Sequence, residues 1–285
     1  MENTKSPEIL LVGHITLDED AYGVHLGGSI FFASQLLRIL KQKANIVTSY
    51  NTNMFTPILG GQFNVNVVKS SSTTTFVNYY KSGKREQIVK SIASHIVDKD
   101  IPKNVRNADL VFLAPVINEI NLDVVSLFET NLVVANLQGW LRQVDKTGLV
   151  NEKKIDLDQI LQYVDIAIIS KEDINDWSVL EDWKNKVEVL VVTIGSGGCN
   201  LNVDNKWHHV PGIKVAEIDS IGAGDIFATA YMLKYFQTFD FLQAAVFANY
   251  VAGVSVEGPR TSKLADRLLA DKWNWLDGYG QNRPI

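Results

Sequence analysis

Short apolar runs of strand length alternate along this chain with segments of helical spacing. The runs cover residues 9–12, 110–114, 132–135, 166–169 and 189–194, and each has the length and composition of a buried strand. Between most of them the apolar residues recur with helical spacing, as in 30–40 and 157–164. Because strands that alternate with helices form a parallel sheet covered on both faces, we predict an α/β fold with a mostly parallel central sheet.

Two regions depart from that alternation. Residues 62–68 and 73–80 alternate polar and apolar positions on either side of a serine run, which predicts an antiparallel hairpin with one solvated face that could act as a lid. The C-terminal part is helical instead, over 223–236, 241–256 and 262–273. Without a repeat or a Pro-rich linker, we predict one domain over 1–285, with a lid formed from about 14–28 and 62–100.

Composition narrows the classes of partner. Of the 285 residues 46% are hydrophobic, enough for one large core, and the formal charge of -5 argues against bulk attraction to nucleic acid or to anionic lipid. Cys199 is the only cysteine, so no internal disulfide can form. No apolar run has the length of a signal peptide core or a membrane span. We expect a cytoplasmic protein with neither a nucleic-acid nor a membrane partner.

The stretch 219–227 reads Asp-Ser-Ile-Gly-Ala-Gly-Asp-Ile-Phe and leads into a helical pattern. Gly222 and Gly224 flank the helix start, where small residues let backbone N–H groups approach a ligand and the helix N-terminus favours an anion. Asp225 could accept a proton from a hydroxyl lying beside a bound phosphate. Phosphoryl transfer needs both elements, although a Gly-x-Gly-Asp sequence can also be a simple capped helix entry.

These nine residues resemble the second signature of the ribokinase-like (PfkB) carbohydrate kinase family. The resemblance implies a three-layer ribokinase-like sandwich with a small β lid, and ATP and Mg²⁺ as cofactors. It implies that Asp225 is the catalytic base and that the backbone of Gly222, Ala223 and Gly224 forms an anion hole. Asp219 would help to bind a monovalent cation such as K⁺.

Earlier motifs resemble the acceptor side of that family. Asp18 stands where the family binds substrate hydroxyls, and Gly27 and Gly28 precede a helix as in its first signature. Phe32 replaces the Asn usually found four residues after the second glycine, a change that bears on substrate identity. The 73–80 strand and the 83–85 Gly-Lys-Arg turn resemble the lid hairpin, although alone they indicate only an amphipathic sheet.

Residues 136–142, Asn-Leu-Gln-Gly-Trp-Leu-Arg, follow a buried strand at the edge of the sheet where ligands tend to bind. The segment resembles one found in an inositol-kinase-like branch of the family. Gln138 and Arg142 are therefore candidate substrate-binding residues, with an ordinary surface arginine as the alternative.

The family often has Asn-x-x-Glu where this chain has Ser170-Lys171-Glu172-Asp173. By resemblance Asp173 holds magnesium through water, with Glu172 as the alternative ligand. The strand and glycine turn of 191–198 resemble the nucleotide-binding turn but not a Walker loop, since no Lys follows the glycines. The cofactor-binding candidates are Thr193, Gly195, Ser196, Gly198 and, in the wall of an adenine pocket, Asn249.

These patterns predict an ATP-dependent kinase that phosphorylates a hydroxyl of a sugar or polyol, with inositol as one candidate. Two alternatives remain: a nucleoside or other small-alcohol kinase of the same fold, and a non-catalytic member that binds a ligand or partner protein. The small-molecule acceptor is the expected partner, and the lid strands could also pair two copies of the chain.

Overall fold

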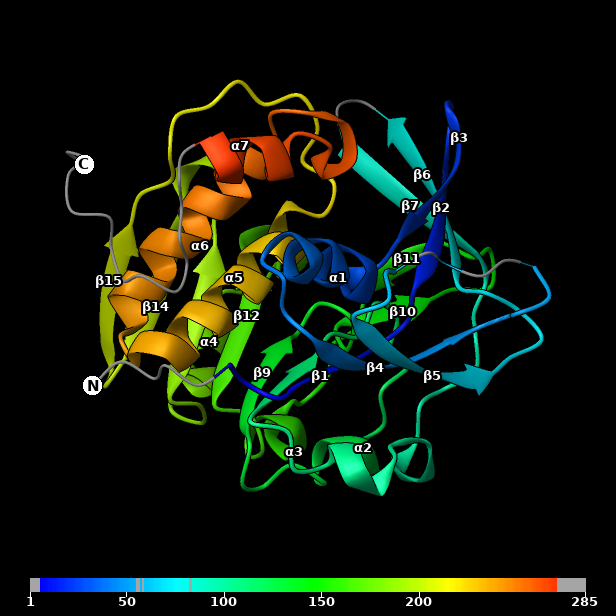
Figure 1. Ribbon diagram of the computed structural model, residues 1–285, viewed down its shortest axis with the longest axis horizontal. Coiled ribbons are helices and arrows are strands. Elements are labelled where there is room, and N and C mark those ends of the chain that lie inside the picture. The colour runs from blue at the N-terminus through cyan, green and yellow to red at the C-terminus, as the bar shows by residue number, and fades with distance from the viewer. Residues whose placement is uncertain (1–5, 55–56, 58, 82–83, 271–285) are drawn as a thin grey trace.

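A computed structural model describes residues 6–54, 57, 59–81 and 84–270. Its centre is a nine-stranded sheet (Figure 1). In spatial order the strands are β15 (Lys206–Val210), β14 (Cys199–Val203), β13 (Val189–Thr193), β12 (Ile166–Ser170), β9 (Leu132–Asn136), β8 (Leu110–Leu113), β1 (Ile9–Val12), β4 (Ala44–Tyr50) and β5 (Phe63–Lys69). The pairings from β13 to β5 are parallel, whereas β14 and β15 are antiparallel. The predicted α/β class with a mostly parallel sheet is confirmed.

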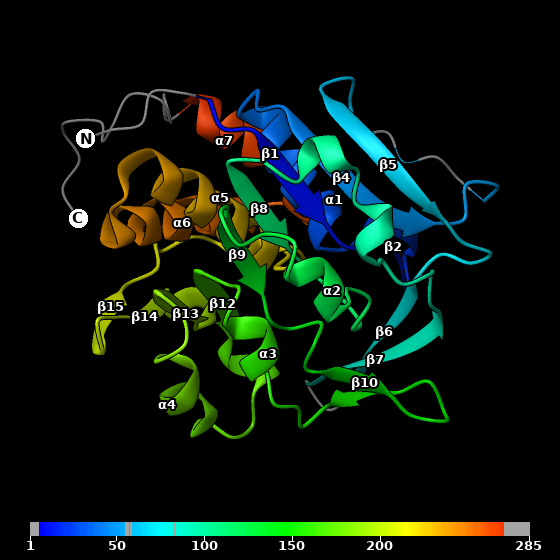
Figure 2. The same cartoon turned by 90° about the horizontal axis from the view of Figure 1, so that it is seen from below.

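Helices cover both faces of this sheet. The long helices α1 (Ser29–Ile39), α5 (Ala223–Thr238) and α6 (Phe241–Ser255) lie on one face together with α7 (Leu264–Ala270) (Figure 1). The short helices α2 (Leu122–Val125), α3 (Asp158–Leu161) and α4 (Val179–Trp183) lie on the other (Figure 2). Within the described residues no helix is both long and apolar enough to cross a membrane.

Alternation along each strand divides the core into two layers. In β1, Leu11 packs in the cluster under α1, α5 and α6, while Leu10 packs in the cluster on the α2–α4 side. In β8, Phe112 and Val111 divide in the same way. Because both faces are buried, each of these strands is apolar at every position, which is why they were recognisable as continuous runs.

A second, four-stranded sheet lies to one side of the large one, on the right of Figure 1. Its strands are β3 (Gly23–Gly27), β2 (Thr16–Asp20), β6 (Thr75–Lys81) and β7 (Lys84–Ser91). It has a small core of its own, formed by Phe76, Val89, Val116 and Ile117. The two-stranded unit of β10 (Arg142–Val144) and β11 (Val150–Glu152) lies beside β7 through a bridge between Ile88 and Leu149.

The predicted hairpin of 62–68 with 73–80 is wrong. β5 pairs in parallel with β4 as the edge of the large sheet, and β6 pairs with β7 and β2 in the small one. An edge strand has one solvated face, so its alternation of polar and apolar residues does not reveal which sheet it joins. Gly83 of the expected lid turn lies outside the described residues, as does the end of the expected 262–273 helix beyond residue 270.

His14 joins the two sheets where the chain passes from β1 to β2. Its ring nitrogens lie 2.8 Å from Thr74 Oγ1 and 2.9 Å from the carbonyl oxygen of Ser94. Since the carbonyl can only accept, Nε2 carries the proton and Nδ1 accepts from the threonine hydroxyl. Burial lowers the pKa of His14, which keeps the ring neutral. The buried Glu119 carboxylate accepts the His14 backbone N–H at 3.0 Å, so this junction is fully hydrogen-bonded.

Candidate active site

The first turn of α5 presents unpaired backbone donors. Gly222 caps the helix at φ 81, a left-handed conformation that favours glycine. The Ala223 N–H donates to the Ser220 carbonyl at 3.1 Å. Among the residues that the structure describes, the amides of Gly224 and Asp225 have no hydrogen-bond acceptor, and a Cβ at Gly224 would meet nothing within 4 Å. These amides are therefore available to an anion.

Phe32 packs directly against that loop. A Cβ on Gly222 would come within 2.4 Å of the Phe32 ring, and Phe32 itself is only 2% exposed. The aromatic residue that departs from the family pattern therefore fills the space between α1 and the start of α5. Gly222 is needed here for its positive φ and also for this close approach.

Asp225 lies half-buried at the same helix start, held by two side chains. Asn136 Nδ2 donates to Asp225 Oδ1 at 3.2 Å, and Ser29 is a second hydrogen-bond partner. Burial raises the pKa of Asp225 to about 6; Ser29 and Arg142 oppose that rise, while the charges of Asp18 and Asp173 add to it. Residues predicted from distant parts of the sequence thus act on one carboxylate, whose pKa is close to the value that suits a general base at neutral pH.

Asp18 lies on β2, where close packing explains the glycine pair. Its side chain is buried and Oδ1 accepts from Thr16 Oγ1 at 3.3 Å. A Cβ on Gly27 would come within 2.2 Å of Asp18 Oδ2, and one on Gly28, at φ 86, within 2.6 Å of the His14 carbonyl oxygen. The two glycines let α1 begin directly against the small sheet.

Gln138 and Asp173 meet at the carboxyl ends of β9 and β12. Gln138 Nε2 donates to Asp173 Oδ1 at 2.6 Å, whereas Glu172 is exposed. Arg142 Nη1 donates to the Val116 carbonyl at 3.2 Å, which directs the guanidinium to the side of the site where its charge acts on Asp225. The structure therefore brings Gln138, Arg142 and Asp173 together around the candidate base.

Both carboxylate oxygens of Asp219 hold backbone amides. Oδ1 accepts from Ile221 N and Oδ2 from Arg260 N, each at 2.9 Å. Asp219 therefore ties the loop before α5 to the segment after α6. A bound cation would have to share these oxygens with the amides.

The other cofactor candidates lie on the turn between β13 and β14. Gly195, at φ 61, has open space around it and Ser196 is exposed, so both are accessible to a ligand. Gly198, at φ 93, is packed instead, since a Cβ there would lie 2.2 Å from the Val210 carbonyl oxygen. Thr193 Oγ1 lies 3.5 Å from the Ile169 carbonyl oxygen and belongs to the sheet edge.

Asn249 has a packing task as well. It is buried in α6 and its Nδ2 donates to the carbonyl oxygens of Val210 at 2.9 Å and Pro211 at 3.2 Å. These bonds join α6 to the end of β15 and occupy both amide hydrogens.

The model of the pfkB family carbohydrate kinases matches residues 64–266. This chain belongs to the PfkB family. Its sequence is 29% identical over 174 residues to a putative sugar kinase of Pyrococcus horikoshii, covering 59% of this chain and 52% of that protein. It is 25% identical over 176 residues to a nucleoside kinase of Methanocaldococcus jannaschii, covering 57% and 56%. The chain thus spans about half the length of these curated relatives.

Solved structures share the ribokinase-like fold. A pyrophosphate-dependent kinase in the ribokinase family, complexed with a pyrophosphate analog and myo-inositol, superposes with a TM-score of 0.74 at 19% identity, over 88% of this chain and 96% of that one. The Pyrococcus sugar kinase, in complex with ATP, gives a TM-score of 0.72 at 18% identity over 94% and 98%. At these identities the likeness establishes the fold alone.

Magnesium, which the PfkB family implies, fits the donor set. In the described part of the chain no group of three or more His, Cys, Asp or Glu residues could form an all-protein metal cage. Hydrated magnesium does not need one, because it is commonly held by one or two carboxylates together with substrate phosphates. Asp173, half-buried and tied to Gln138, is placed to act as such a carboxylate.

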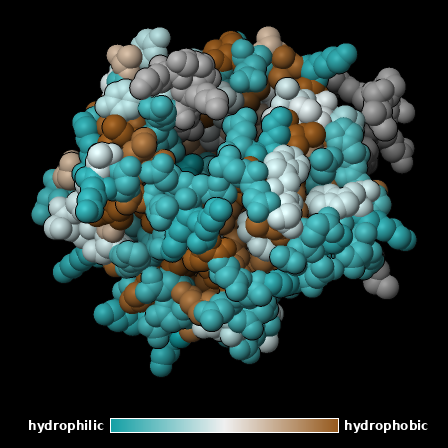
Figure 3. All heavy atoms as spheres, turned by 180° about the vertical axis from the view of Figure 1, so that it is seen from behind, coloured by the Kyte–Doolittle hydropathy of each residue, from teal (hydrophilic) through white to brown (hydrophobic). Residues whose placement is uncertain are grey.

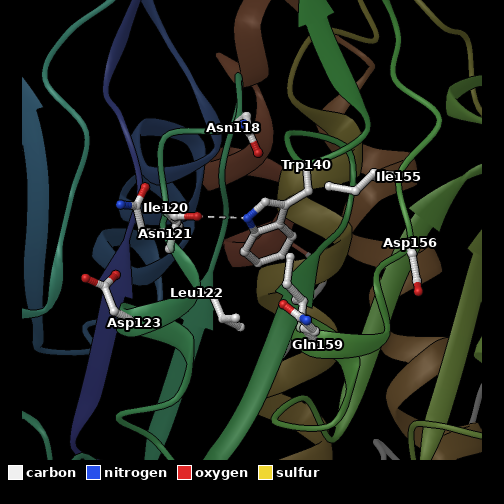
Figure 4. A pocket seen from close by; sticks show the side chains of 10 residues that line it. Asn118, Ile120, Asn121, Leu122, Asp123, Trp140, Ile155, Asp156 and Gln159 are labelled. Carbon is white, nitrogen blue, oxygen red and sulfur yellow. Dashed lines mark hydrogen bonds between the residues drawn. The ribbon is translucent and has the colours of Figure 1, made fainter.

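A separate hollow of about 420 Å³ lies at the α2–α3 side (Figure 4). It is lined by Asn118, Asp123, Asp156 and Gln159 around Trp140, whose Nε1 donates to the Ile120 carbonyl at 2.9 Å. None of the predicted site residues of this PfkB member lines it. The face opposite α5 and α6 is mostly hydrophilic, with hydrophobic side chains in small groups (Figure 3).

Ser29 and Asn136 are site residues that the sequence reasoning did not single out. Ser29 is the first residue of α1, directly after Gly28, and Asn136 is the last residue of β9. A polar residue at the carboxyl end of a buried strand was the available signal for Asn136. For Ser29 no local signal existed, because its partner lies almost 200 residues away in sequence.

Proposed function

We propose that this chain transfers a phosphoryl group from ATP to a hydroxyl of a sugar or polyol, with Asp225 as the general base. The observation that carries this proposal is the position of Asp225 at the start of α5. Its carboxylate has a pKa of about 6 and lies among unpaired backbone amides, within electrostatic reach of Asp18 on the small sheet. A proton acceptor next to an anion site is what hydroxyl phosphorylation requires.

In the proposed mechanism each residue has a separate task. Asp18 binds acceptor hydroxyls, and Asp225, fixed by Ser29 and Asn136, removes the proton of the reacting hydroxyl. The amides of Gly224 and Asp225 stabilise negative charge on the transferring group, as preorganised donors do. Magnesium, which Asp173 would hold, neutralises phosphate charge when it is bound.

The donor nucleotide is proposed to bind along the turn that contains Gly195 and Ser196. Their accessibility supports this role, whereas Gly198 and Asn249 support the site by packing. The Pyrococcus relative bound to ATP favours ATP as the donor, and the pyrophosphate-dependent neighbour makes pyrophosphate the rival to test. Inositol is a candidate acceptor because the 136–142 segment resembles one of an inositol-kinase-like branch, which is supported by the bond of Gln138 to Asp173 and the effect of Arg142 on Asp225. The Methanocaldococcus relative keeps nucleosides as the second class.

A donor and acceptor panel tests the proposal. Purified protein is incubated with ATP or pyrophosphate, with magnesium, and with sugars, polyols including inositol, or nucleosides, and phosphorylated product is measured. We expect acceptor-dependent product with ATP and at least one sugar or polyol. Product with nucleosides alone would move the protein to the second class. Absence of product with every pair would reject the kinase proposal in favour of a binding protein.

We also propose that a monovalent cation activates the enzyme near Asp219. The motif position supports it, while the two amides already bound to the carboxylate limit how strongly a cation can bind. Turnover in magnesium with potassium should then exceed turnover in magnesium with a bulky organic cation. Equal rates in the two buffers would exclude this role.

A further inference from the structure

The residue that spans the two sides of the candidate site is Arg260, in the segment after α6. Its backbone N–H donates to Asp219 Oδ2 at 2.9 Å. Asp219 lies in the loop before α5, and we call this loop and the start of α5 the phosphate side of the site. The Arg260 guanidinium extends to the small sheet, where Nη2 donates to Asp20 Oδ2 at 3.1 Å. One residue thus contacts both the loop before α5 and the strand that carries Asp18.

The second terminal nitrogen of Arg260, Nη1, differs from Nη2 because it makes no hydrogen bond. Nη1 is buried and has no hydrogen-bond partner, and it lies 4.0 Å from Asp18 Oδ2. Because the guanidinium is planar and rigid, the bond from Nη2 to Asp20 also fixes the direction of Nη1. A buried donor without an acceptor is costly, so the arrangement suits a ligand atom that completes it.

The 4.0 Å gap matches a hydroxyl group. A hydroxyl oxygen at about 2.8 Å from each atom could accept from Nη1 while its own hydrogen points to Asp18 Oδ2. A carboxylate or phosphate of the acceptor could accept from Nη1 but would be repelled by Asp18 and Asp20. The charges therefore favour a neutral acceptor over an anionic one.

The register of β2 and β3 adds His25 to the polar groups near Arg260. Asp18 pairs with His25 across β2 and β3, and His25 Nε2 is also buried without a hydrogen bond, 3.6 Å from Asp20 Oδ1. Asp18, Asp20, His25 and Arg260 thus form one polar cluster, which we call the acceptor cluster. It offers both donors and acceptors to a polyhydroxylated ligand.

We propose that Arg260 binds the acceptor, donating from Nη1 to a second, non-reacting hydroxyl that also donates to Asp18, and that it thereby selects neutral polyhydroxylated acceptors. This inference rests on the proposed function in taking the region between Asp225 and Asp18 as the acceptor site. The reacting hydroxyl faces Asp225, and the non-reacting one lies in the acceptor cluster. Arg260 is then a specificity residue, which the sequence motifs did not indicate.

The test variant is Arg260→Gly. Arg260 has φ 45 and ψ 48, a left-handed conformation that glycine adopts without strain, and the glycine keeps the N–H that donates to Asp219. Only the side chain is lost. Arg267→Gln is the matched control, because Arg267 pairs with Glu257 in the same C-terminal part, outside the acceptor cluster.

Acceptor binding is measured by calorimetry without nucleotide, for sugars, polyols and nucleosides and for analogues that each lack one hydroxyl. For the wild type, loss of one particular hydroxyl should weaken binding by roughly 10- to 100-fold, the range for a hydrogen bond to a charged group. Arg260→Gly should weaken binding of the parent compound, and the difference in affinity between the parent and that analogue should shrink to the part that the hydroxyl's bond to Asp18 supplies. Arg267→Gln should behave as the wild type.

Three results would overturn the assignment. The first is that Arg260→Gly binds the parent compound within about 2-fold of the wild type. The second is that Arg260→Gly weakens binding of the parent and of every analogue by the same factor, which indicates a structural role. The third is that the wild type binds no compound of the panel. Failure of the kinase proposal looks different. In that case the wild type binds an acceptor without phosphorylating it, and the binding ratios still decide the role of Arg260.

Discussion

The two sides of the candidate site differ in how they are supported. The phosphate side begins a 16-residue helix that is buried among α1, α6 and the large sheet, and its loop is fixed by Asp219 and by Phe32. The acceptor side, which carries Asp18, lies on the small sheet. This sheet has a core of four buried residues and is joined to the large sheet at His14. A short sequence motif can describe the first side, whereas the second depends on contacts between distant segments. The phosphate side is thus packed into the large core, whereas the acceptor side rests on a small core of its own.

The largest effect is expected at the centre of the phosphate side. Asp225→Asn keeps the shape but removes the proton acceptor, so kcat should fall by about 100- to 10,000-fold. A variant that keeps more than about a tenth of wild-type kcat would remove Asp225 from the role of base.

The same variant should be more stable than the wild type at neutral pH. Since the folded-state pKa is raised from 3.8 to about 6, the ionised carboxylate destabilises the fold above that range by roughly 3 kcal/mol. Urea unfolding should show a gain at pH 7.5 that shrinks towards pH 4, where the carboxyl is protonated in the folded wild type and partly protonated in the unfolded chain. Equal stability at both pH values would contradict the raised pKa.

Two glycine variants sharpen the comparison within the phosphate side. Gly222→Ala combines a positive φ with a clash against Phe32, so it should lose roughly 1–3 kcal/mol of unfolding free energy. Gly224→Ala meets no atom within 4 Å and should fold as the wild type, yet weaken donor turnover by crowding the anion site. Phe32→Ala is itself destabilising, but Gly222→Ala should cost less stability in that background than in the wild type, and Phe32→Ala should restore none of the activity of the Gly224 variant. Equal stability losses in the two glycine variants would refute the packing argument.

The pH dependence of kcat/KM should report the pKa of Asp225 and the influence of Arg142 on it. With the pKa of Asp225 at about 6, kcat/KM should rise with pH through that value and then level off. Arg142 holds this pKa down, so Arg142→Gln should move the acid limb to higher pH. A limb that stays in place would show that Arg142 does not face the base.

The smallest expected effect concerns closure of the acceptor side. If the four-stranded sheet moves onto the acceptor, amide exchange in β2, β3, β6 and β7 should slow when acceptor is bound. β5, an edge strand of the large sheet, is the internal control and should not change. Identical exchange with and without acceptor would show that the small sheet is fixed.

The sequence revealed what local pattern encodes. The buried strands β1, β8, β9, β12 and β13, the three long helices and the motif around Asp225 were predicted, because periodicity and glycine placement act over a few residues, whereas the buried strand β4 was not. It did not reveal that residues 63–69 join the large sheet, since one solvated face is common to any edge strand. Nor did it reveal Ser29 or Arg260, whose partners lie far away in sequence.

Phe32 was partly predictable from the sequence. Its departure from the family pattern was visible in the sequence, and we expected a change in the substrate contact. The structure shows in addition that the ring packs against Gly222, so the side chain at position 32 also supports the start of α5. Only the fold could show which of the neighbours the new side chain would meet.

The neutral imidazole of His14 makes the joint between the sheets sensitive to acid. Its pKa is lowered from 6.5 by burial, so the intact joint is fully stable above that value and is weakened as the pH falls below it. This range overlaps the pH at which Asp225 takes up a proton and could no longer act as the proposed base. Acid inactivation should therefore combine two events with different time courses. Protonation of Asp225 would reverse at once on returning to neutral pH. Re-formation of the contacts between the two sheets would be slower and would delay the recovery of activity.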